Sequence, residues 1–158
     1  MGRQKEMVVA LTGHQYQRLA SKESYVVKWM KRILEIIGEG QTDFVAICGG
    51  AAGSDELFGR VCVDKKIPFR LYLPTEDYRG KELNYLKSHC SFVVAIADEW
   101  EKGLDTKRDK MMVDDCDILL AVWDGIPAGG TYQTIRYAAK QGKPVIFMPR
   151  TIFKREIL

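Results

Sequence analysis

The stretch Phe44-Val45-Ala46-Ile47-Cys48-Gly49-Gly50-Ala51-Ala52-Gly53-Ser54-Asp55 decides the fold. Its first five residues are apolar, as in a short strand that is covered on both faces. Glycines then end the strand, and Ser54 is a good N-cap for the helix that the following residues predict. A buried strand, a glycine turn and a helix in this order are typical of a parallel α/β sheet.

The same alternation continues on both sides of this stretch. Apolar runs of strand length predict five further strands, over residues 7–11, 69–73, 92–96, 118–123 and 145–148. Apolar residues at helical spacing predict helices over residues 24–37, from residue 54 onward, and over 81–88, 107–115 and 131–141. We therefore expect an α/β fold of the Rossmann-like type, with three layers, a mostly parallel sheet of about six strands and helices on both faces. No linker or repeat divides residues 1–158, which predicts a single domain.

The composition fits one globular domain and excludes several classes of protein. The chain has 158 residues and is 46% hydrophobic and 28% charged, as in ordinary globular proteins. Its 24 basic and 21 acidic residues give a net charge of only +3, too small for the basic stripe of a typical nucleic-acid-binding protein. No apolar run approaches the ~20 residues that a membrane span needs, and the first residues do not form a signal peptide. We expect a cytoplasmic protein with no membrane partner.

The cysteines do not form a metal-binding pattern. No pair has C-x-x-C spacing, and the sequence contains only two histidines that could complete a site. We therefore expect reduced structural thiols, no bound metal and no resident cofactor. The four cysteines are Cys48, Cys62, Cys90 and Cys116, of which the first and last are expected to be buried.

Three loops at the expected carboxyl ends of strands carry the candidate binding residues. Ligands of open parallel sheets bind beyond these strand ends, where the strand order reverses. Glycine lets the backbone approach a ligand closely, and a helix N-terminus offers free N–H groups to phosphate. We expect two such helix starts, at Ser54 and Thr131, to face one crevice and bind a nucleotide-like ligand. The candidate ligand-binding residues are Thr12, Gly13, His14, Gly49, Gly50, Gly53, Ser54, Asp55, Arg108, Asp124, Gly125, Gly129, Gly130, Thr131 and Thr134.

Individual residues suggest roles, each with a structural alternative. Asp55 and Asp124 are candidates to accept hydrogen bonds from ribose hydroxyls. The structural alternative for Asp55 is that its negative charge, in the first turn of a helix, interacts favourably with the helix dipole and stabilises the helix. Arg108 is a candidate for a phosphate contact, and His14 is a candidate to flank a base. The glycines alone would equally serve tight turns in a compact fold. Three aromatic residues are candidates to stack on the base: Tyr16, Trp123 and Tyr132.

Several motifs together resemble the SLOG superfamily. They are Thr12-Gly13-His14, Gly49–Asp55, Met112–Asp117, Ala121–Gly125 with Gly129-Gly130-Thr131, and Thr134–Ala138. They occur in the family's order over nearly the whole chain, and the branch that they resemble most is the YpsA-like group, related to DprA/Smf and to the LOG proteins. The resemblance implies a Rossmann-like domain that binds nucleotides or nucleotide-derived ligands, including ADP-ribose-type signals of antiphage systems. Among related proteins, some cleave the N-glycosidic bond of nucleoside monophosphates, and those of the DprA type bind single-stranded DNA.

Three departures from the family patterns bear on activity. The cleaving LOG enzymes resemble P-G-G-x-G-T-x-x-E with a catalytic glutamate, and the equivalent position here is Arg136, while Tyr132 replaces the middle glycine. The YpsA-like group usually reads Thr-Gly-His-Arg-Pro, and different residues follow His14 here. Asp109 stands where an asparagine commonly follows the arginine. The first difference argues against phosphoribohydrolase activity of the LOG type, and the negative charge of Asp109 implies a ligand position that differs from that in the related proteins.

We therefore expect a protein that binds a nucleotide-derived small molecule, an ADP-ribose-like or cyclic-nucleotide signal, and that senses or sequesters it in a conflict between phage and bacterium. The alternative is a nucleoside or nucleotide N-glycosidase in which Asp55 or Glu56 supplies the carboxylate that an oxocarbenium-like transition state needs. Binding of single-stranded DNA is a third hypothesis, which the small net charge disfavours. A homodimer or larger homo-oligomer is expected because related proteins often pair through helices.

Overall fold

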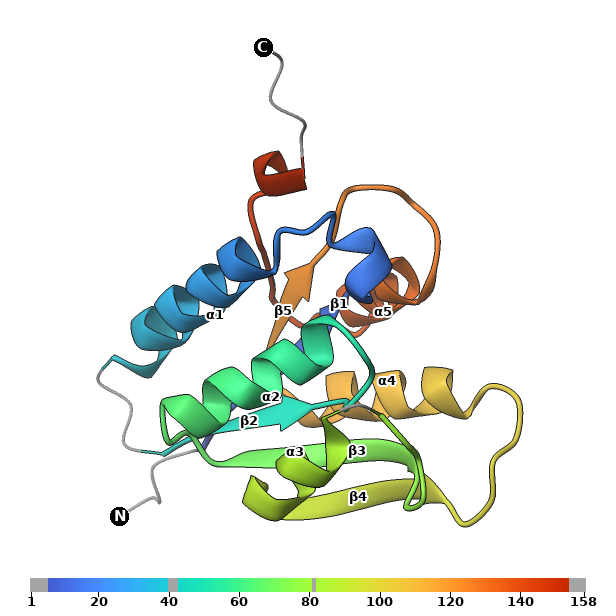
Figure 1. Ribbon diagram of the computed structural model, residues 1–158. Helices are drawn as coiled ribbons and strands as arrows, with labels where there is room; N and C mark the ends of the chain where they lie inside the picture. Colours follow the sequence, from blue (N-terminus) through green and yellow to red (C-terminus); the bar gives the residue numbers. More distant parts are fainter. Residues whose placement is uncertain (1–5, 40–42, 81, 154–158) are drawn as a thin grey trace.

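A parallel sheet forms the centre of the computed structural model, which describes residues 6–39, 43–80 and 82–153 (Figure 1). Its six strands have the order β4-β3-β2-β1-β5-β6, and every neighbouring pair is parallel. The α/β class and the strand number are as the sequence predicts, and the sheet is parallel throughout. The strands are β1 (Met7–Gly13), β2 (Phe44–Cys48), β3 (Phe69–Thr75), β4 (Phe92–Ala97), β5 (Ile118–Val122) and β6 (Val145–Phe147).

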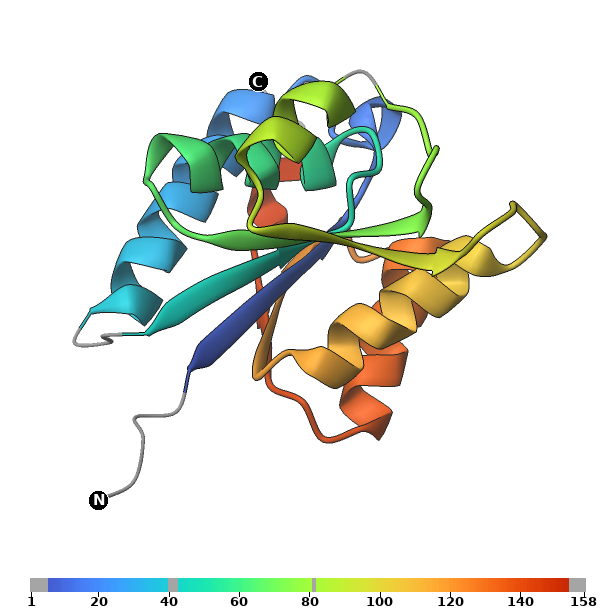
Figure 2. The same cartoon turned by 90° about the horizontal axis from the view of Figure 1, so that it is seen from below.

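Helices cover both faces of this sheet and complete three layers (Figure 2). One face carries α1 (Glu23–Gly38), α2 (Ser54–Asp64) and α3 (Leu83–His89), and the other carries α4 (Leu104–Asp115) and α5 (Gly130–Lys140). Two short 3-10 turns, η1 (Tyr16–Arg18) and η2 (Arg150–Phe153), follow β1 and β6. The two-sided cover explains why β2 and β5 are apolar throughout and β1 nearly so.

The alternation of side chains along β1 divides the core into two parts. Val9 and Leu11 pack in the larger core beneath α1 to α3, while Val8 and Ala10 pack in the smaller core beneath α4 and α5. Successive side chains of a strand point to opposite faces, so a strand that alternates between two cores must be apolar at every position. The strand at the centre of the sheet is thereby held rigidly from both sides.

Some expected boundaries are wrong. Strand β3 does not stop before Pro74 but continues to Thr75, and β5 ends at Val122, so Trp123 lies beyond the strand. Helix α4 begins at Leu104, which places Arg108 in its middle and not at its start. The expected start of the 81–88 helix lies outside the described residues, and α3 begins at Leu83.

The strand order reverses beside β1. Strand β2 lies on one side of β1 and β5, which comes much later in the chain, lies on the other. The chain after β1 and the chain after β5 lead to helices on opposite faces of the sheet, and parallel sheets bind ligands beyond the strand ends at such a point. The glycine-containing loops after β1, β2 and β5 lie at this edge of the sheet.

Candidate functional site

A crevice of about 390 Å³ opens at the carboxyl end of β1. Strand β1, the turn η1 and the starts of α2, α4 and α5 all contribute to its lining. The lining residues are Leu11, Thr12, Gly13, His14, Gln15, Gln17, Arg18, Ala51, Asp55, Asp105, Arg108, Asp109, Gly130 and Thr131. Seven of the residues expected from the sequence are therefore brought together here: Thr12, Gly13, His14, Asp55, Arg108, Gly130 and Thr131.

The start of α5 faces the crevice with its backbone open. Gly129 is the N-cap and carries no side-chain cap, so no side chain of the helix itself satisfies the first N–H groups. A Cβ atom placed on Gly130 would meet nothing within 4 Å. The N–H groups and the positive end of the dipole of this 11-residue helix are thus accessible from the crevice.

The start of α2 is closed, against expectation. Ser54 is the first helical residue and not the N-cap, which is Gly53. The Ser54 backbone N–H donates to the His14 carbonyl oxygen at 3.0 Å, and its hydroxyl donates to the same oxygen at 2.7 Å. Because β1 and η1 already occupy this helix end, Ser54 ties β1 to α2 and does not face the crevice.

Two carboxylates and an arginine form the opposite wall. Arg108 is 4% exposed and donates to the Gly49 carbonyl oxygen at 2.7 Å and to the Asp109 carboxylate at 2.8 Å. The Asp55 carboxylate accepts the Ala51 N–H at 3.2 Å. Burial raises the pKa of Asp55 to about 7, although the nearby Arg108 opposes the shift. Asp55 is therefore partly protonated near neutral pH and can either donate or accept a hydrogen bond.

Asp109 is held in place by its neighbours on α4 and α5. It accepts from Arg108 and lies 3.4 Å from the Thr134 hydroxyl, which itself donates to the Gly130 carbonyl oxygen at 2.8 Å. Burial raises the pKa of Asp109, and Arg108 counteracts this effect. For Arg108 itself, burial disfavours the charged form, but Asp109 and Asp55 outweigh burial and raise its pKa. The buried cation is thus compensated, which leaves carboxylate oxygens as the dominant polar groups of this wall.

The third wall is a network around Asp124. One Arg18 nitrogen donates to both Asp124 oxygens at 3.0 and 2.9 Å, and the Ile126 N–H donates to the same carboxylate. Burial alone would raise the pKa of Asp124, but these hydrogen bonds and His14 lower it. Since its oxygens are engaged, Asp124 is better placed to hold Arg18 and the loop before α5 than to bind ribose. Figure 1 shows η1 and this loop side by side.

His14 accepts a hydrogen bond in this network. Its Nε2 atom lies 3.1 Å from both the Asp124 backbone nitrogen and one Asp124 carboxylate oxygen. The carboxylate favours a protonated ring, but burial has the larger effect and lowers the His14 pKa. Nε2 therefore accepts from the Asp124 N–H, and the residue is 3% exposed at the bottom of the crevice.

The other expected residues lie outside the crevice lining. Gly50 packs against Leu73 and Leu83, and Glu56 is fully buried, where it accepts the Glu82 N–H at the start of α3. Gly49, Gly53, Gly125 and Gly129 shape the backbone around the site without lining it.

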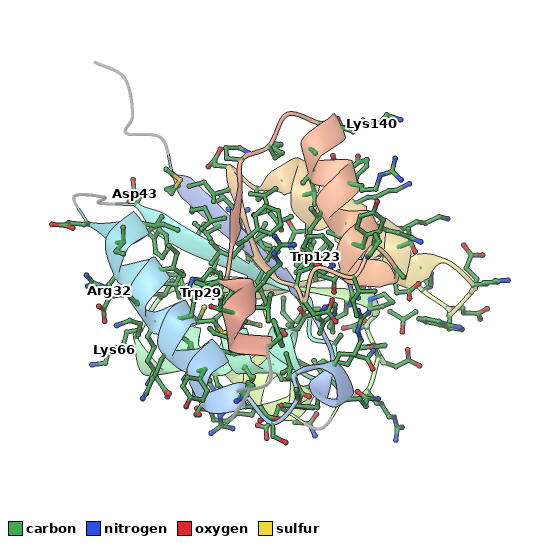
Figure 3. All side chains as sticks on the ribbon, turned by 90° about the horizontal axis from the view of Figure 1, so that it is seen from above. Trp29, Arg32, Asp43, Lys66, Trp123 and Lys140 are labelled. Atoms are coloured by element: carbon green, nitrogen blue, oxygen red, sulfur yellow. The ribbon has the colours of Figure 1, made fainter. Side chains whose placement is uncertain are left out.

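The aromatic candidates also point elsewhere. Trp123 stacks on Tyr132 at 5.9 Å and lies between α5 and η2 (Figure 3). Tyr16 packs against the larger core. Among the described residues, the crevice lining therefore offers no aromatic platform for base stacking. Arg136, at the position of the LOG glutamate, is exposed on α5.

Comparisons with known proteins find relatives by structure. A molybdenum cofactor binding protein from Rippkaea orientalis is 18% identical with a TM-score of 0.66, covering 92% of this chain and 77% of that chain. The molybdenum cofactor carrier protein from Chlamydomonas reinhardtii is 16% identical with a TM-score of 0.63, covering 90% and 76%. DNA processing protein A from Helicobacter pylori, described with a single-stranded DNA binding mode, is 18% identical with a TM-score of 0.64, covering 90% and 65%. No protein-family model and no curated protein sequence matches the chain.

These similarities show a shared fold. They agree with the relation to the SLOG superfamily that the motifs indicate, while the YpsA-like branch stays a prediction. The chain spans 65% of the length of the DNA processing protein, so that protein contains a substantial part with no counterpart here. The fold places a binding crevice at the same sheet edge in all parallel sheets of this kind.

Sequence reasoning missed several residues of the site. Arg18 lies four residues after His14, and this closeness to the end of β1 was a usable signal. Asp105, Arg108 and Asp109 share one face of α4 through i, i+3 and i+4 spacing, so the expected arginine pointed to both acids. Gln15 and Gln17 carried no signal. Among the described residues, no three His, Cys, Asp or Glu side chains come together as a metal site, and no helix is long and apolar enough to cross a membrane.

Proposed function

We propose that the protein binds a phosphorylated, nucleotide-derived small molecule in the crevice at the carboxyl end of β1. The phosphate would accept from the open N–H groups at the start of α5, near Gly130 and Thr131. The hydroxyl groups of a ribose would donate to Asp55 and Asp109 on the opposite wall. Backbone donors on one side and carboxylate acceptors on the other are the requirements of a sugar phosphate.

The observation that carries this proposal is a difference between the starts of α2 and α5. The α2 start is occupied by the His14 carbonyl oxygen, whereas the α5 start has no side-chain cap and lines a cavity. Uncapped helix N–H groups are normally satisfied by a side chain, by water or by a ligand. Thr134 and Arg18 hold the surrounding backbone, so the α5 start is supported for binding without being filled.

Charge at residue 130 tests the phosphate site directly. Gly130→Asp places a carboxylate in open space at the first turn of α5, where the helix dipole favours it and folding is not impaired. The same charge repels a phosphate, so we expect the affinity for AMP in calorimetric titration to fall about tenfold or more. Gly130→Asn has nearly the same shape without the charge and reports the steric effect. Equal affinity of the two variants would contradict a phosphate at α5.

The identity of the ligand is best read from the protein itself. Native mass spectrometry of protein purified from cells, followed by identification of any retained molecule, tests the proposal without a guess at the base. Thermal-shift titration then compares AMP, ADP-ribose, cyclic nucleotides and molybdenum cofactor, the last because similar structures are named for it. The prediction of a phage-related signal that is captured in the cytoplasm requires that ADP-ribose-like or cyclic compounds bind more tightly than AMP. A single-stranded oligonucleotide completes the panel and is expected not to bind.

Hydrolysis of an N-glycosidic bond is the second candidate. It is favoured by Asp55, which lies in the crevice with a pKa raised to about 7, since such a carboxyl group can serve as an acid or a base near neutral pH. Release of free base from nucleoside monophosphates, followed by chromatography, measures this activity. Loss of release in Asp55→Asn would support it, and tight binding without any release would exclude it. Glu56 lies outside the lining and is expected to be dispensable for such chemistry.

The sheet edge suggests a second copy of the chain as a further partner. Strand β4 pairs with β3 on one side, and no described strand pairs with it on the other. Its residues are Phe92-Val93-Val94-Ala95-Ile96-Ala97, with no charge or proline to block pairing, and Phe92 is 50% exposed. Arg70 lies over the Phe92 ring at the start of β4, and Asp98 and Glu99 follow its end. Two antiparallel β4 strands would bring these opposite charges together twice, by two-fold symmetry.

A further inference from the structure

A second hollow lies on the far side of Arg18. It has a volume of about 750 Å³, and Arg18 lines both this hollow and the crevice, so the two adjoin at that side chain. The loop after β5 and the turn η2 form its walls. The lining residues are Arg18, Ala20, Asp124, Ile126, Pro149, Arg150, Thr151 and Phe153.

Arg150 lines this hollow as an exposed residue. Its guanidinium lies 6.0 Å from the Trp123 ring. It also lies against Gly125, where a Cβ atom would stand 2.9 Å from one guanidinium nitrogen. Gly125 has a φ of +91°, a conformation that side chains other than glycine rarely adopt. Glycine at this position therefore serves both the turn and the close approach of Arg150.

Among the described residues, none forms an ion pair with Arg150. Of the described residues that line the hollow, Asp124 is the acid, and it is already engaged by Arg18 and by the Ile126 N–H. The described lining of the hollow thus holds two arginines and one acid, an excess of positive charge beside the proposed phosphate site.

Arg18 and Arg150 approach the same short segment from two sides. Arg18 binds the carboxylate of Asp124, and Arg150 lies against the next residue, Gly125. An anion that extends from the crevice past Arg18 would thus reach a second guanidinium, that of Arg150, which lies against Gly125 and near the Trp123 ring. A guanidinium offers several N–H donors in a planar fork that matches phosphoryl oxygens.

We propose that this hollow, which we call the Arg150 subsite, binds a second phosphoryl group of the ligand. The inference rests on the proposed function, since the first phosphoryl group would bind at α5. It assigns the ligand to the class that carries two phosphoryl groups, such as a nucleoside diphosphate derivative or a bisphosphate. A nucleoside monophosphate would fill the crevice only.

The test measures how much a second phosphoryl group on the ligand raises the binding affinity, and compares this increase between variants. Calorimetric titration uses AMP against ADP, ADP-ribose and adenosine 3′,5′-bisphosphate, with the wild type, Arg150→Gln and the control Arg32→Gln, an exposed arginine of α1 far from the site in sequence. We expect at least one doubly phosphorylated compound to bind the wild type about tenfold or more tightly than AMP. The gain should vanish in Arg150→Gln and remain in Arg32→Gln, while AMP binding is the same in all three.

A second variant guards against indirect effects of the arginine change. Gly125→Ala keeps Arg150 but places a methyl group where its guanidinium lies. This variant should therefore also lose the tighter binding of doubly phosphorylated compounds relative to AMP. Thermal unfolding of each variant shows whether the fold is intact. The subsite is overturned if no doubly phosphorylated compound exceeds AMP, or if the gain survives Arg150→Gln. If AMP itself fails to bind the wild type, the proposed function has failed, which is a different result.

Discussion

At the residue scale, the buried Asp55 carboxyl group makes stability depend on pH. Its pKa is raised from 3.8 to about 7 in the folded protein, mainly by burial. Between these two values the folded state binds more protons than the unfolded state, so its contribution to stability is complete below about pH 4 and is lost as the pH rises through about 7. The ionised form must then stay buried near Asp109, with Arg108 as partial compensation.

Replacement of Asp55 by asparagine isolates this effect. The asparagine amide cannot ionise and has nearly the same shape, so the stability of Asp55→Asn relative to the wild type should rise between about pH 5 and pH 8, by roughly 2–4 kcal/mol because each pKa unit corresponds to about 1.4 kcal/mol. Urea denaturation of both proteins at several pH values measures the difference. Other groups with shifted pKa values, such as His14 and Asp109, act in both proteins and largely cancel. A difference that does not change with pH would show that Asp55 is ionised throughout.

The positions of some single site residues could be predicted from the sequence, and those of others could not. Asp55, Gly130 and Thr131 lie at helix starts that local patterns can find, and they line the crevice. Arg108 also lines it, but from the middle of α4 and not from the helix start that the sequence predicts. Ser54 was misjudged, since its N–H and hydroxyl bind the carbonyl oxygen of a residue 40 positions away. A tertiary contact of this kind leaves no trace in the local sequence.

At the scale of elements, Gly53 lies where β1, η1 and α2 meet. It caps α2 with a φ of +96°, and a Cβ atom there would lie 2.5 Å from the Gln15 α-carbon and 2.7 Å from the His14 carbonyl oxygen. Backbone cannot move aside as a flexible side chain can, so Gly53→Ala must push β1, η1 and α2 apart. We expect a loss of more than about 2 kcal/mol, or no stable fold.

Gly103 provides the matched control. It caps α4 with a φ of +90°, and a Cβ atom there would meet nothing within 4 Å. Gly103→Ala therefore carries the strain of the left-handed conformation alone, about 1 kcal/mol. Chemical denaturation measures both losses, and the excess at Gly53 reports crowding together with its stricter backbone conformation, since ψ is −127° at Gly53 and 0° at Gly103. Similar losses in the two would mean that the contact between Gly53 and η1 gives way easily.

Most strands and helices could be predicted from the sequence. All six strands were expected within two residues of their observed ends, because each is an apolar run between polar turns. The start of α4 was missed, since its first turn is polar and exposed and its only buried residue there is Leu104. Periodicity finds a helix by its buried face, and it says little where that face has barely begun.

At the scale of the whole molecule, the fold class follows from the alternation of elements, whereas the strand order does not. That β5 returns to pair with β1 is decided by long-range packing of α4 beneath β1 and β3. This return creates the crevice and also leaves β4 as an edge strand. The same topological choice thus sets the site and the surface where a second copy would bind.

The edge pairing can be tested by charge at one residue of β4. Ala95 is exposed on this strand, and Ala95→Lys would set two lysines against each other across a two-fold β4 interface. We expect the wild type to have the mass of a dimer in light scattering after size exclusion, and Ala95→Lys to have the mass of a monomer. Phe147→Lys, at the short opposite edge β6, should leave the dimer intact, because Phe147 is 45% exposed and lies on the other side of the sheet. A monomeric wild type, or a dimer that withstands Ala95→Lys, would exclude β4 as the interface, and dissociation by Phe147→Lys would assign it to β6 instead.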